Sequence, residues 1–307
     1  ACWLWGGGWL AHLGATLTLG HGFADFGGSA LLMWLPGMLA LGFLIAQPRS
    51  GDPEPPSAPP PAHFPLLANL GVLFLGIGWC GWTLAGPFHL SGVTWDLGRT
   101  AVSALLGMAG ATLTAQLYAW LVTGELESLL AARGIAAGWG AALAGAPFLA
   151  PWAALVVGLL AGLSFSLLLY MIETHLRLRD ASAVVALGVS GGLWGLLSVG
   201  LFADGKAGQG LNAIGASIGS DPGLGVAGLI GGNWKQLQAQ LVGIVAIGLW
   251  GLLWGGLLGF LNAPRRPFRR AAVPEVAEAK VAAITPPAET TETETPSIDG
   301  TDPTETT

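Results

Sequence analysis

The feature that most constrains this chain is a long run of apolar sequence without charge. From Gly134 to Ile172 there is no charged residue. A helix crosses the hydrocarbon core of a bilayer with about 20 apolar residues, so this run is too long for one crossing. Pro147 and Pro151 divide it into a short span near residues 134–146 and a full span near residues 150–172. The run therefore predicts helices that lie in a membrane.

The same criterion finds further spans along the chain. Charge-free apolar stretches also cover residues 27–46, 64–86, 100–122, 181–203 and 236–262, which brings the number of spans to seven. The opening residues 1–11 indicate the end of one more helix. The chain is 52% hydrophobic and 10% charged, whereas soluble domains carry roughly 25% charged residues. We predict an all-α membrane protein with about seven transmembrane helices.

The cationic residues predict how the spans are oriented, because cytoplasmic loops carry an excess of Lys and Arg. If the span at residues 27–46 runs from outside to inside, eight arginines fall on the cytoplasmic side. Four of these form a cluster at residues 265–270. Only Arg99, Lys206 and Lys235 then lie outside. This bias predicts an integral protein of the cell (plasma) membrane with a cytoplasmic C-terminus.

Composition also divides the chain into a membrane domain and a tail. The membrane domain is predicted to cover residues 1–264 and to include two loops. One is the proline-rich loop at residues 47–63, which favours extended backbone. The other is the glycine-rich outer loop at residues 204–233. Residues 265–307 form a basic junction and an acidic tail rich in Thr and Pro, which is predicted to be disordered because it can bury little apolar surface.

Several functional classes find no support in the sequence. No basic stripe indicates nucleic-acid binding. The two cysteines, Cys2 and Cys80, lie in apolar sequence without the spacing of a metal site or a disulfide framework. Paired carboxylates within the spans, a nucleophile elbow and a phosphate-binding loop are all absent from the sequence. We expect neither a metal, nor a cofactor, nor enzymatic activity.

Two motifs at the starts of predicted spans carry the strongest functional signal. The first runs from Asp25 to Met33, and the second runs from Asp180 through Gly188 to Gly195. Both resemble the pore helices of the ammonium transporter family (Amt/Mep/Rh). In that family a pore histidine follows the aspartate of the first motif by eight residues, and the second motif leads to another. Here Met33 and Gly188 occupy those two places.

Other segments extend the resemblance over roughly residues 1–262. They are the opening run around Trp5, the segment 77–82, the helix boundary at 145–154 and the segment 231–237. The family fold has eleven helices, of which the first ten form two inverted repeats, and substrate paths in such folds lie between the repeats. The resemblance implies that this chain holds the end of helix 4 through helix 11. Most of the first repeat would then be missing, so we expect a truncated chain or a partner chain that supplies the rest.

Two residues match the outer substrate-recruitment region of the family. Trp5 corresponds to a vestibule tryptophan, where a desolvated cation–π contact is worth about 2 kcal/mol. Its alternative role is that of an interfacial tryptophan. Asp25 could favour the approach of a cation, but its place at a helix start favours a helix cap. Asp180 has the same position in the second motif, and we interpret it as a structural helix cap.

The predicted pore differs from the family at two further points. Trp82 takes the place of a phenylalanine that gates the pore, with core packing as the alternative, and Gly86 replaces a serine. Imidazole relays protons because it both donates and accepts near neutral pH, whereas neither Met33 nor Gly188 can do so. Both could instead be packing residues, with Gly188 in a small-residue face of the helix.

Two functions follow from these observations. The first is an ammonium or ammonia transporter or channel, in which Trp5, Asp25 and Trp82 take the roles described above. The second is a transport-inactive homologue that serves as a sensor or structural membrane subunit, which the residues at 33 and 188 favour. The resemblance also implies a lipid bilayer as surroundings, a homo-trimer, and a regulatory protein on the cytoplasmic side.

Overall fold

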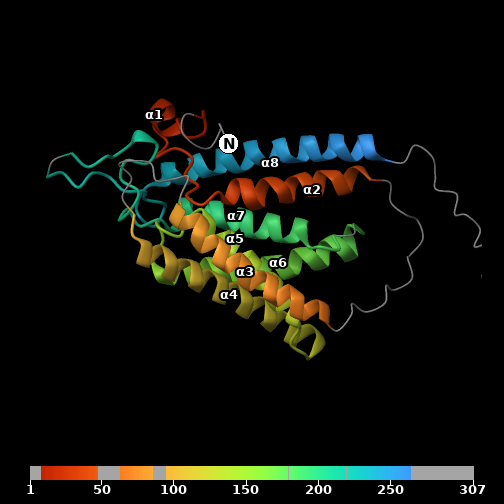
Figure 1. Ribbon diagram of the computed structural model, residues 1–307. Coiled ribbons are helices and arrows are strands. Elements are labelled where there is room, and N and C mark those ends of the chain that lie inside the picture. Colours follow the sequence, from red (N-terminus) through yellow and green to blue (C-terminus); the bar gives the residue numbers. More distant parts are fainter. Residues whose placement is uncertain (1–7, 48–62, 86–94, 179, 219, 264–307) are drawn as a thin grey trace, which may run out of the picture. The chain divides into compact units, whose positions relative to one another are not determined.

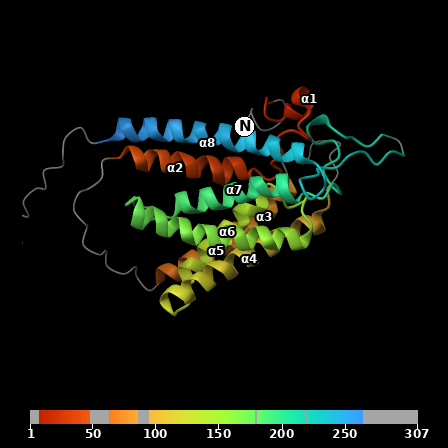
Figure 2. The ribbon, with the colours of Figure 1, turned by 180° about the vertical axis from the view of Figure 1, so that it is seen from behind.

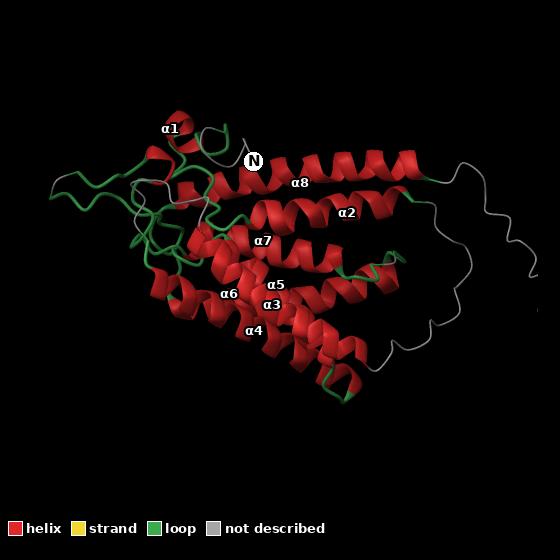
Figure 3. Ribbon diagram, in the orientation of Figure 1, coloured by secondary structure: helices red, strands yellow, loops and turns green. Residues whose placement is uncertain are grey.

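The computed structural model describes residues 8–47, 63–85, 95–178, 180–218 and 220–263. These residues form helices joined by turns and loops, and the only β-type pairings among them are isolated bridges. Figure 3 shows this helical character. The remaining residues, which include the acidic tail and Trp5, lie outside the described part of the chain.

The helices follow the predicted spans closely. In the described residues they are α1 (Leu13–Leu17), η1 (Ala30–Trp34), α2 (Leu35–Ala46), α3 (His63–Ala85), α4 (Leu97–Thr123), α5 (Ser128–Leu143), α6 (Pro151–Tyr170), η2 (Met171–His175), α7 (Val184–Phe202), η3 (Leu211–Ala213) and α8 (Trp234–Asn262). The seven predicted spans correspond to α2 with η1, α3, α4, α5, α6 with η2, α7 and α8. The predicted number of apolar helices is thus confirmed for the described residues.

Length and composition separate these helices into two groups. Four of those described are long and apolar enough to cross a membrane: α4, α6 with η2, α7 and α8. The helical segments at residues 30–46, 63–79 and 128–143 are apolar but shorter. The structure differs from the sequence prediction at the start of the chain. Residues 9–12 form turns, and the helix there is the short α1, because Thr18, with φ +55°, and the following glycines turn the chain away.

The packing centres on α7, which lies among α2, α5, α6 and α8 (Figure 1). In its most apolar stretch α7 is 61% buried, compared with 28–39% for the other three long helices. α2 runs alongside α8, and α4 packs against both α5 and α6; Figure 2 shows the same arrangement from behind. α3 packs against α5. The helix nearest the centre is therefore the one that carries the second sequence motif.

Glycines allow these helices to approach closely. A Cβ atom at Gly192 of α7 would lie 2.6 Å from the backbone nitrogen of Trp34. One at Gly251 of α8 would lie 3.0 Å from Met38 Cβ, and one at Gly259 would lie 2.6 Å from the carbonyl oxygen of Phe43. Helices with small residues at their contacts gain packing energy in a bilayer, where burial of apolar surface contributes little. The small-residue face predicted on α7 thus lies at a helix contact, and α8 has a similar face.

One ion pair connects the start of α4 to the glycine-rich loop. The guanidinium of Arg99 donates to Asp204 Oδ2 at 2.7 Å and to the carbonyl oxygen of Leu149 at 2.9 Å. Asp204 also receives the backbone N–H of Lys206, at 3.1 Å. The bonds join the start of α4, the α5–α6 link and the glycine-rich loop at one end of the bundle.

Candidate functional site

The candidate site begins with a non-helical segment, residues 18–29, which we call the lead-in segment. It runs from the end of α1 to the start of η1 and contains Asp25. Residues 21–29 are all buried. Buried polar groups of non-helical backbone need hydrogen-bond partners inside the protein. The partners of this segment include side chains from α3, α8 and the loop after α7.

Asp25 binds the backbone at the junction between the lead-in segment and η1. Its side chain is 6% exposed. Oδ1 accepts the backbone N–H of Ser29 at 2.7 Å, and Oδ2 accepts that of Ala30 at 3.0 Å. Free N–H groups at a helix start favour a negative charge. In this geometry both carboxylate oxygens accept hydrogen bonds from backbone amides at the helix start.

Two glutamines of α8 hold the middle of the lead-in segment. Gln236 Oε1 accepts the backbone N–H of His21 at 2.9 Å, and its Nε2 donates to the carbonyl oxygen of Gly22 at 2.8 Å. One turn further along, Gln240 Nε2 donates to the carbonyl oxygen of Ala24 at 2.7 Å. Both glutamine side chains are fully buried. Two neutral side chains thus replace the hydrogen bonds that a helix would have supplied.

The glycine-rich loop adds a third support. Asn212 Nδ2 donates to the carbonyl oxygens of His21 and Phe23, at 2.7 and 3.2 Å. The His21 ring is buried and its Nε2 lies 3.0 Å from the carbonyl oxygen of Leu224. Burial lowers the pKa of His21 below its usual value of 6.5, so the neutral ring is favoured and Nε2–H is the donor. His21 therefore joins two loops in the interior.

Trp82, on α3, also bonds to the lead-in segment. Its indole N–H donates to the carbonyl oxygen of Gly27 at 3.2 Å, and its side chain is 38% exposed. Gly27 also donates its own N–H to the carbonyl oxygen of Leu143 at 2.7 Å. The residue predicted as a gate and the residue predicted for recruitment, Asp25, therefore contact the same turn of the chain.

Aromatic rings fill the space beside this turn. The Phe26 ring lies 5.4 Å from the Trp95 ring, tilted by 56°, and 6.2 Å from the Phe148 ring in an edge-to-face arrangement. Phe26 is 7% exposed and Phe148 is fully buried. Offset and edge-to-face geometries are those that aromatic pairs favour. The turn is thus packed by rings in addition to its hydrogen bonds.

Met33 lies in η1, where the chain takes a π-helical turn before Pro36. It is buried in a cluster with Trp79, and Trp139 packs against that cluster. A Cβ atom at Gly191 would lie 3.2 Å from Met33 Cε, and one at Gly140 would overlap the Met33 side chain. The thioether therefore points at glycines of α5 and α7 and fills the gap that they leave.

Gly188 lies where α7 crosses α2. A Cβ atom there would lie 2.6 Å from Gly37 Cα and 2.6 Å from the carbonyl oxygen of Met33. No side chain fits at this position unless the two helices separate. An imidazole at residue 188 is therefore incompatible with this packing, which is a stronger departure from the resemblance than the sequence indicated.

Polar contacts of η1, and of Ser29 just before it, hold this part of the chain against its neighbours. Ser29 Oγ donates to the carbonyl oxygen of Gly140 at 3.0 Å. The indole N–H of Trp34 donates to the carbonyl oxygen of Ile244, in α8, at 2.9 Å. Both groups are buried. These bonds position η1 against α5 and α8.

Asp180 lies at the opposite end of the bundle. Its Oδ2 accepts the backbone N–H of Ala186, in the first turn of α7, at 2.9 Å. Ala183 adopts φ +56° immediately before that turn. The four described histidines also lie away from the helix centres: His12 and His21 precede η1, His63 begins α3, and His175 ends η2.

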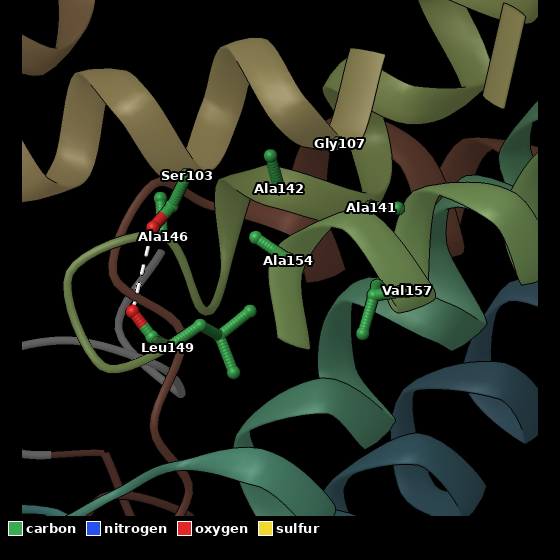
Figure 4. Close-up of a pocket in the computed structure, with 8 residues that line it drawn as sticks. All are labelled: Ser103, Gly107, Ala141, Ala142, Ala146, Leu149, Ala154 and Val157. Atoms are coloured by element: carbon green, nitrogen blue, oxygen red, sulfur yellow. Dashed lines mark hydrogen bonds between the residues drawn. The ribbon is translucent and has the colours of Figure 1, made fainter. Parts of the chain in front are cut away.

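A small apolar pocket lies between α4, α5 and α6 (Figure 4). It is lined by Ser103, Gly107, Ala141, Ala142, Ala146, Leu149, Ala154 and Val157. The Ser103 hydroxyl donates to the carbonyl oxygen of Leu149 at 3.4 Å, a long bond. The pocket has no room for a water molecule, so it is a packing defect and lies apart from the lead-in segment.

Some sequence-predicted residues meet and others do not. Asp25 and Trp82 share the turn that leads to Met33, whereas Asp180 lies elsewhere and Trp5 lies outside the described residues. Among the described residues there is no group of three or more His, Cys, Asp or Glu that could hold a metal ion. The sequence reasoning missed Gln236, Gln240 and Asn212. Gln236 and Gln240 lie four residues apart in an otherwise apolar helix, and such polar residues in a membrane span could have indicated a buried polar contact.

Comparisons with known proteins agree with this architecture. Residues 1–263 match the sequence profile of the Ammonium Transporter Family. The chain is 30% identical over 253 residues to ammonium transporter Amt2 of Archaeoglobus fulgidus, an alignment that covers 81% of this chain and 52% of that protein. It is 29% identical over 270 residues to ammonium transporter 3 of Dictyostelium discoideum, covering 85% and 58%.

Two solved structures share the fold. The first is a sensor Amt protein, with a TM-score of 0.64 and 24% identity over 84% of this chain and 59% of that one. The second is Mep2 of Saccharomyces cerevisiae, with a TM-score of 0.65 and 24% identity over 84% and 53%. At this identity the likeness concerns the fold alone. The chain spans about half the length of the curated relatives it matches.

Proposed function

Because this chain belongs to the Ammonium Transporter Family, which its match over residues 1–263 shows, we propose that it forms part of a transmembrane path for ammonium or ammonia. The protein is an integral membrane protein, with four described helices long and apolar enough to cross a bilayer. We propose the path and the form of the substrate below.

The observation that carries the proposal is the convergence on one turn of chain. Asp25 holds the amides of Ser29 and Ala30, while the indole of Trp82 holds the carbonyl oxygen of Gly27. Non-helical backbone held in this way is typical of membrane proteins only where it is buried in protein or lines a path. We assign Asp25 to organising this turn, Trp82 to controlling access beside it, and Trp5 to recruiting the cation outside.

The residues at positions 33 and 188 determine what this path can do. Neither a thioether nor a glycine relays a proton, so the path has no proton wire of imidazoles at these positions. Neutral ammonia, or a cation that crosses whole, is then the species that moves. Passage needs no covalent step and no cofactor.

Uptake of radiolabelled methylammonium tests the proposal. Cells that lack their own ammonium transporters would express the gene that encodes this chain, with any upstream sequence. We expect saturable uptake above the vector control, and a loss of uptake in Asp25→Ala. Trp152→Phe is a matched control, because Trp152 is 55% exposed and lies at the start of α6. Absence of uptake by correctly folded, membrane-inserted protein would contradict the proposal.

One observation favours a second candidate, a transport-inactive sensor or structural subunit. At Gly188 the contact between α7 and α2 is closed, because an added Cβ would lie 2.6 Å from Gly37 Cα. Under this candidate the protein binds ammonium without uptake and signals through its C-terminal residues. Ammonium-dependent protection of the membrane domain from proteolysis, with no uptake, would distinguish it from the transporter.

The remaining assignments complete the proposal. We place the protein in the plasma membrane with its C-terminus in the cytoplasm, since the cationic residues at 265–270 follow α8 directly. We assign it a homo-trimeric assembly and a regulatory protein partner on the cytoplasmic side. Chemical cross-linking in native membranes tests the trimer, and protease access to the C-terminal tail in sealed vesicles tests the orientation.

A further inference from the structure

The side chain of Trp139 carries a polar group without a partner. Trp139 lies on α5, one residue before the glycine against which Met33 packs. Its indole Nε1 is buried and donates to no acceptor in the described structure, sulfur included. A buried N–H without an acceptor is costly, and native structures rarely contain one without a reason.

The apolar neighbours of Trp139 come from four elements. Its ring packs against a cluster of Met33 from η1, Trp79 from α3, Ala104 from α4, and Ala142 and Leu143 from α5. The indole N–H is thus a polar donor beside thioether, aromatic and methyl groups.

We propose that Trp139 is a substrate-binding residue whose indole N–H donates a hydrogen bond to the lone pair of neutral ammonia. The proposal rests on the proposed function, because it takes ammonia as the molecule that reaches this cluster. It adds the substrate form and the residue that selects it.

The chemistry of the two substrate forms decides between them. Ammonia has a lone pair and accepts from an N–H donor, whereas ammonium has only donors and would face the indole N–H donor to donor. A cation would also lose its hydration beside the apolar side chains of this cluster. The faces of Trp79 and Trp139 attract cations, and this attraction is the competing effect that the experiment must separate.

Other tryptophans of the bundle show what a structural indole does here. The N–H of Trp34 donates to the carbonyl oxygen of Ile244 at 2.9 Å, and that of Trp194 donates to Ser164 Oγ at 3.0 Å. Each spans two helices and is satisfied within the protein. Trp139 differs from both, since its ring packs in the same way but its donor is left for a molecule that is not part of the chain.

The first test is independent of transport. The protein, with its tryptophans labelled with nitrogen-15, is placed in lipid nanodiscs and the indole N–H resonances are recorded. The Trp139 resonance is the one that disappears in Trp139→Phe. Ammonium chloride is added at the same total concentration at mildly acidic and at alkaline pH, with sodium chloride as the control at each pH.

We expect the Trp139 resonance to move with added ammonium chloride at alkaline pH, where neutral ammonia is abundant, and to stay fixed at acidic pH. The Trp194 resonance should stay fixed at both. A Trp139 resonance that does not move, or that moves equally at both pH values, overturns the inference, the latter because it indicates the cation. Movement without measurable uptake supports the inference and counts against the proposed function.

The second test measures flux. In proteoliposomes with an ammonium gradient, Trp139→Phe keeps the ring and removes the donor, and Trp194→Phe does the same at a satisfied site. We expect ammonia flux to fall roughly five- to tenfold in Trp139→Phe, the range that one hydrogen bond is worth, and to stay at the wild-type value in Trp194→Phe. Equal flux in the two variants, in a wild type that transports, would remove Trp139 from the path.

Discussion

The glycines of α7 and those of α3 have opposite surroundings. On α7, an added Cβ at Gly188 or Gly192 would lie 2.6 Å from backbone atoms of α2 or η1. On α3, Gly71 and Gly78 have no described heavy atom within 4 Å of such a Cβ. The two helices have the same kind of composition, but only one of them uses its glycines to contact described neighbours. Glycine content alone therefore does not identify a helix–helix contact.

The lead-in segment resembles α7 in being enclosed by other parts of the chain. We call α7, its contacts with α2 and η1, and the lead-in segment the closed region. Side chains from α3, α8 and the loop after α7 hold its backbone. On α3, by contrast, Leu66 and Leu73 are 71% and 65% exposed, which suits lipid or a helix outside the described residues. The comparison predicts that substitutions in the closed region cost stability and that matching substitutions on α3 do not.

The largest effect is expected at the closest contact. Gly188→His should destabilise the protein by about 3 kcal/mol, at the upper end for overpacked sites, since its Cβ alone would lie 2.6 Å from Gly37 Cα. Met33→His should cost less, because it replaces a flexible side chain of similar length. Thermal unfolding in detergent measures both. A Gly188→His protein that melts with the wild type would refute the closed contact.

Asp25→Ala should cost about 2 kcal/mol, toward the upper end for the loss of a helix cap. It removes both acceptors for the amides of Ser29 and Ala30. Asp96→Ala is the control, because Asp96 is an exposed N-cap on α4, where water replaces the lost bond. Equal losses of stability in the two variants would show that the burial of Asp25 adds nothing.

Gln240→Leu should cost about 1–2 kcal/mol, because it leaves the buried carbonyl oxygen of Ala24 without its donor. Gln116→Leu is the matched control, since Gln116 bonds to the backbone of Glu127 at an exposed turn. Hydrogen exchange of the amides at residues 21–25 would report the loosening directly. Unchanged protection in Gln240→Leu would contradict the role of this side chain.

Gly71→Ala on α3 should stabilise the protein by about 1 kcal/mol, because Ala has the higher helix propensity and nothing described lies within 4 Å. Gly134→Ala on α5 is the opposing control, with its Cβ 2.9 Å from Thr112 Cα. The sign of the change in unfolding temperature is the measurement. A destabilising Gly71→Ala would reveal that residues outside the described part cover this face.

The smallest effect concerns pH at the lead-in segment. Burial lowers the pKa of His21 below its usual 6.5, so the unfolded chain binds a proton at higher pH than the folded one. The stability due to the neutral ring is complete above about pH 6.5 and declines as the pH falls through that value. The unfolding temperature of His21→Gln should depend less on pH over this interval. Parallel curves for the two proteins would exclude His21 as the cause.

The sequence predicted the helices well, because each span is a charge-free stretch of adequate length. It also offered a packing role for Gly188 in a small-residue face of its helix. It did not predict how completely Gly188 is enclosed, since the distance to Gly37 depends on how α2 and α7 cross. Periodicity along one helix contains no information about that crossing.

The candidate site was only partly accessible to sequence reasoning. Asp25 and Trp82 were identified from motifs, but their meeting at one turn required the fold. The roles of Gln236 and Gln240 depend on contacts across more than 200 residues of sequence, which local patterns cannot show. The position of His21 depends on equally distant partners, since its backbone N–H bonds to Gln236 and its ring bonds to the carbonyl oxygen of Leu224.

These distant contacts also constrain the order of events during synthesis. The amide of His21 and the carbonyl oxygen of Ala24 have partners 215 and 216 residues later in the chain. At about 5–20 residues per second, a ribosome needs roughly 10–40 seconds to make that intervening length. Throughout this interval these two backbone groups lack the partners that hold them in the folded protein. The segment can settle into its buried position only after α8 has been inserted, so its burial is among the last steps in the biogenesis of the protein.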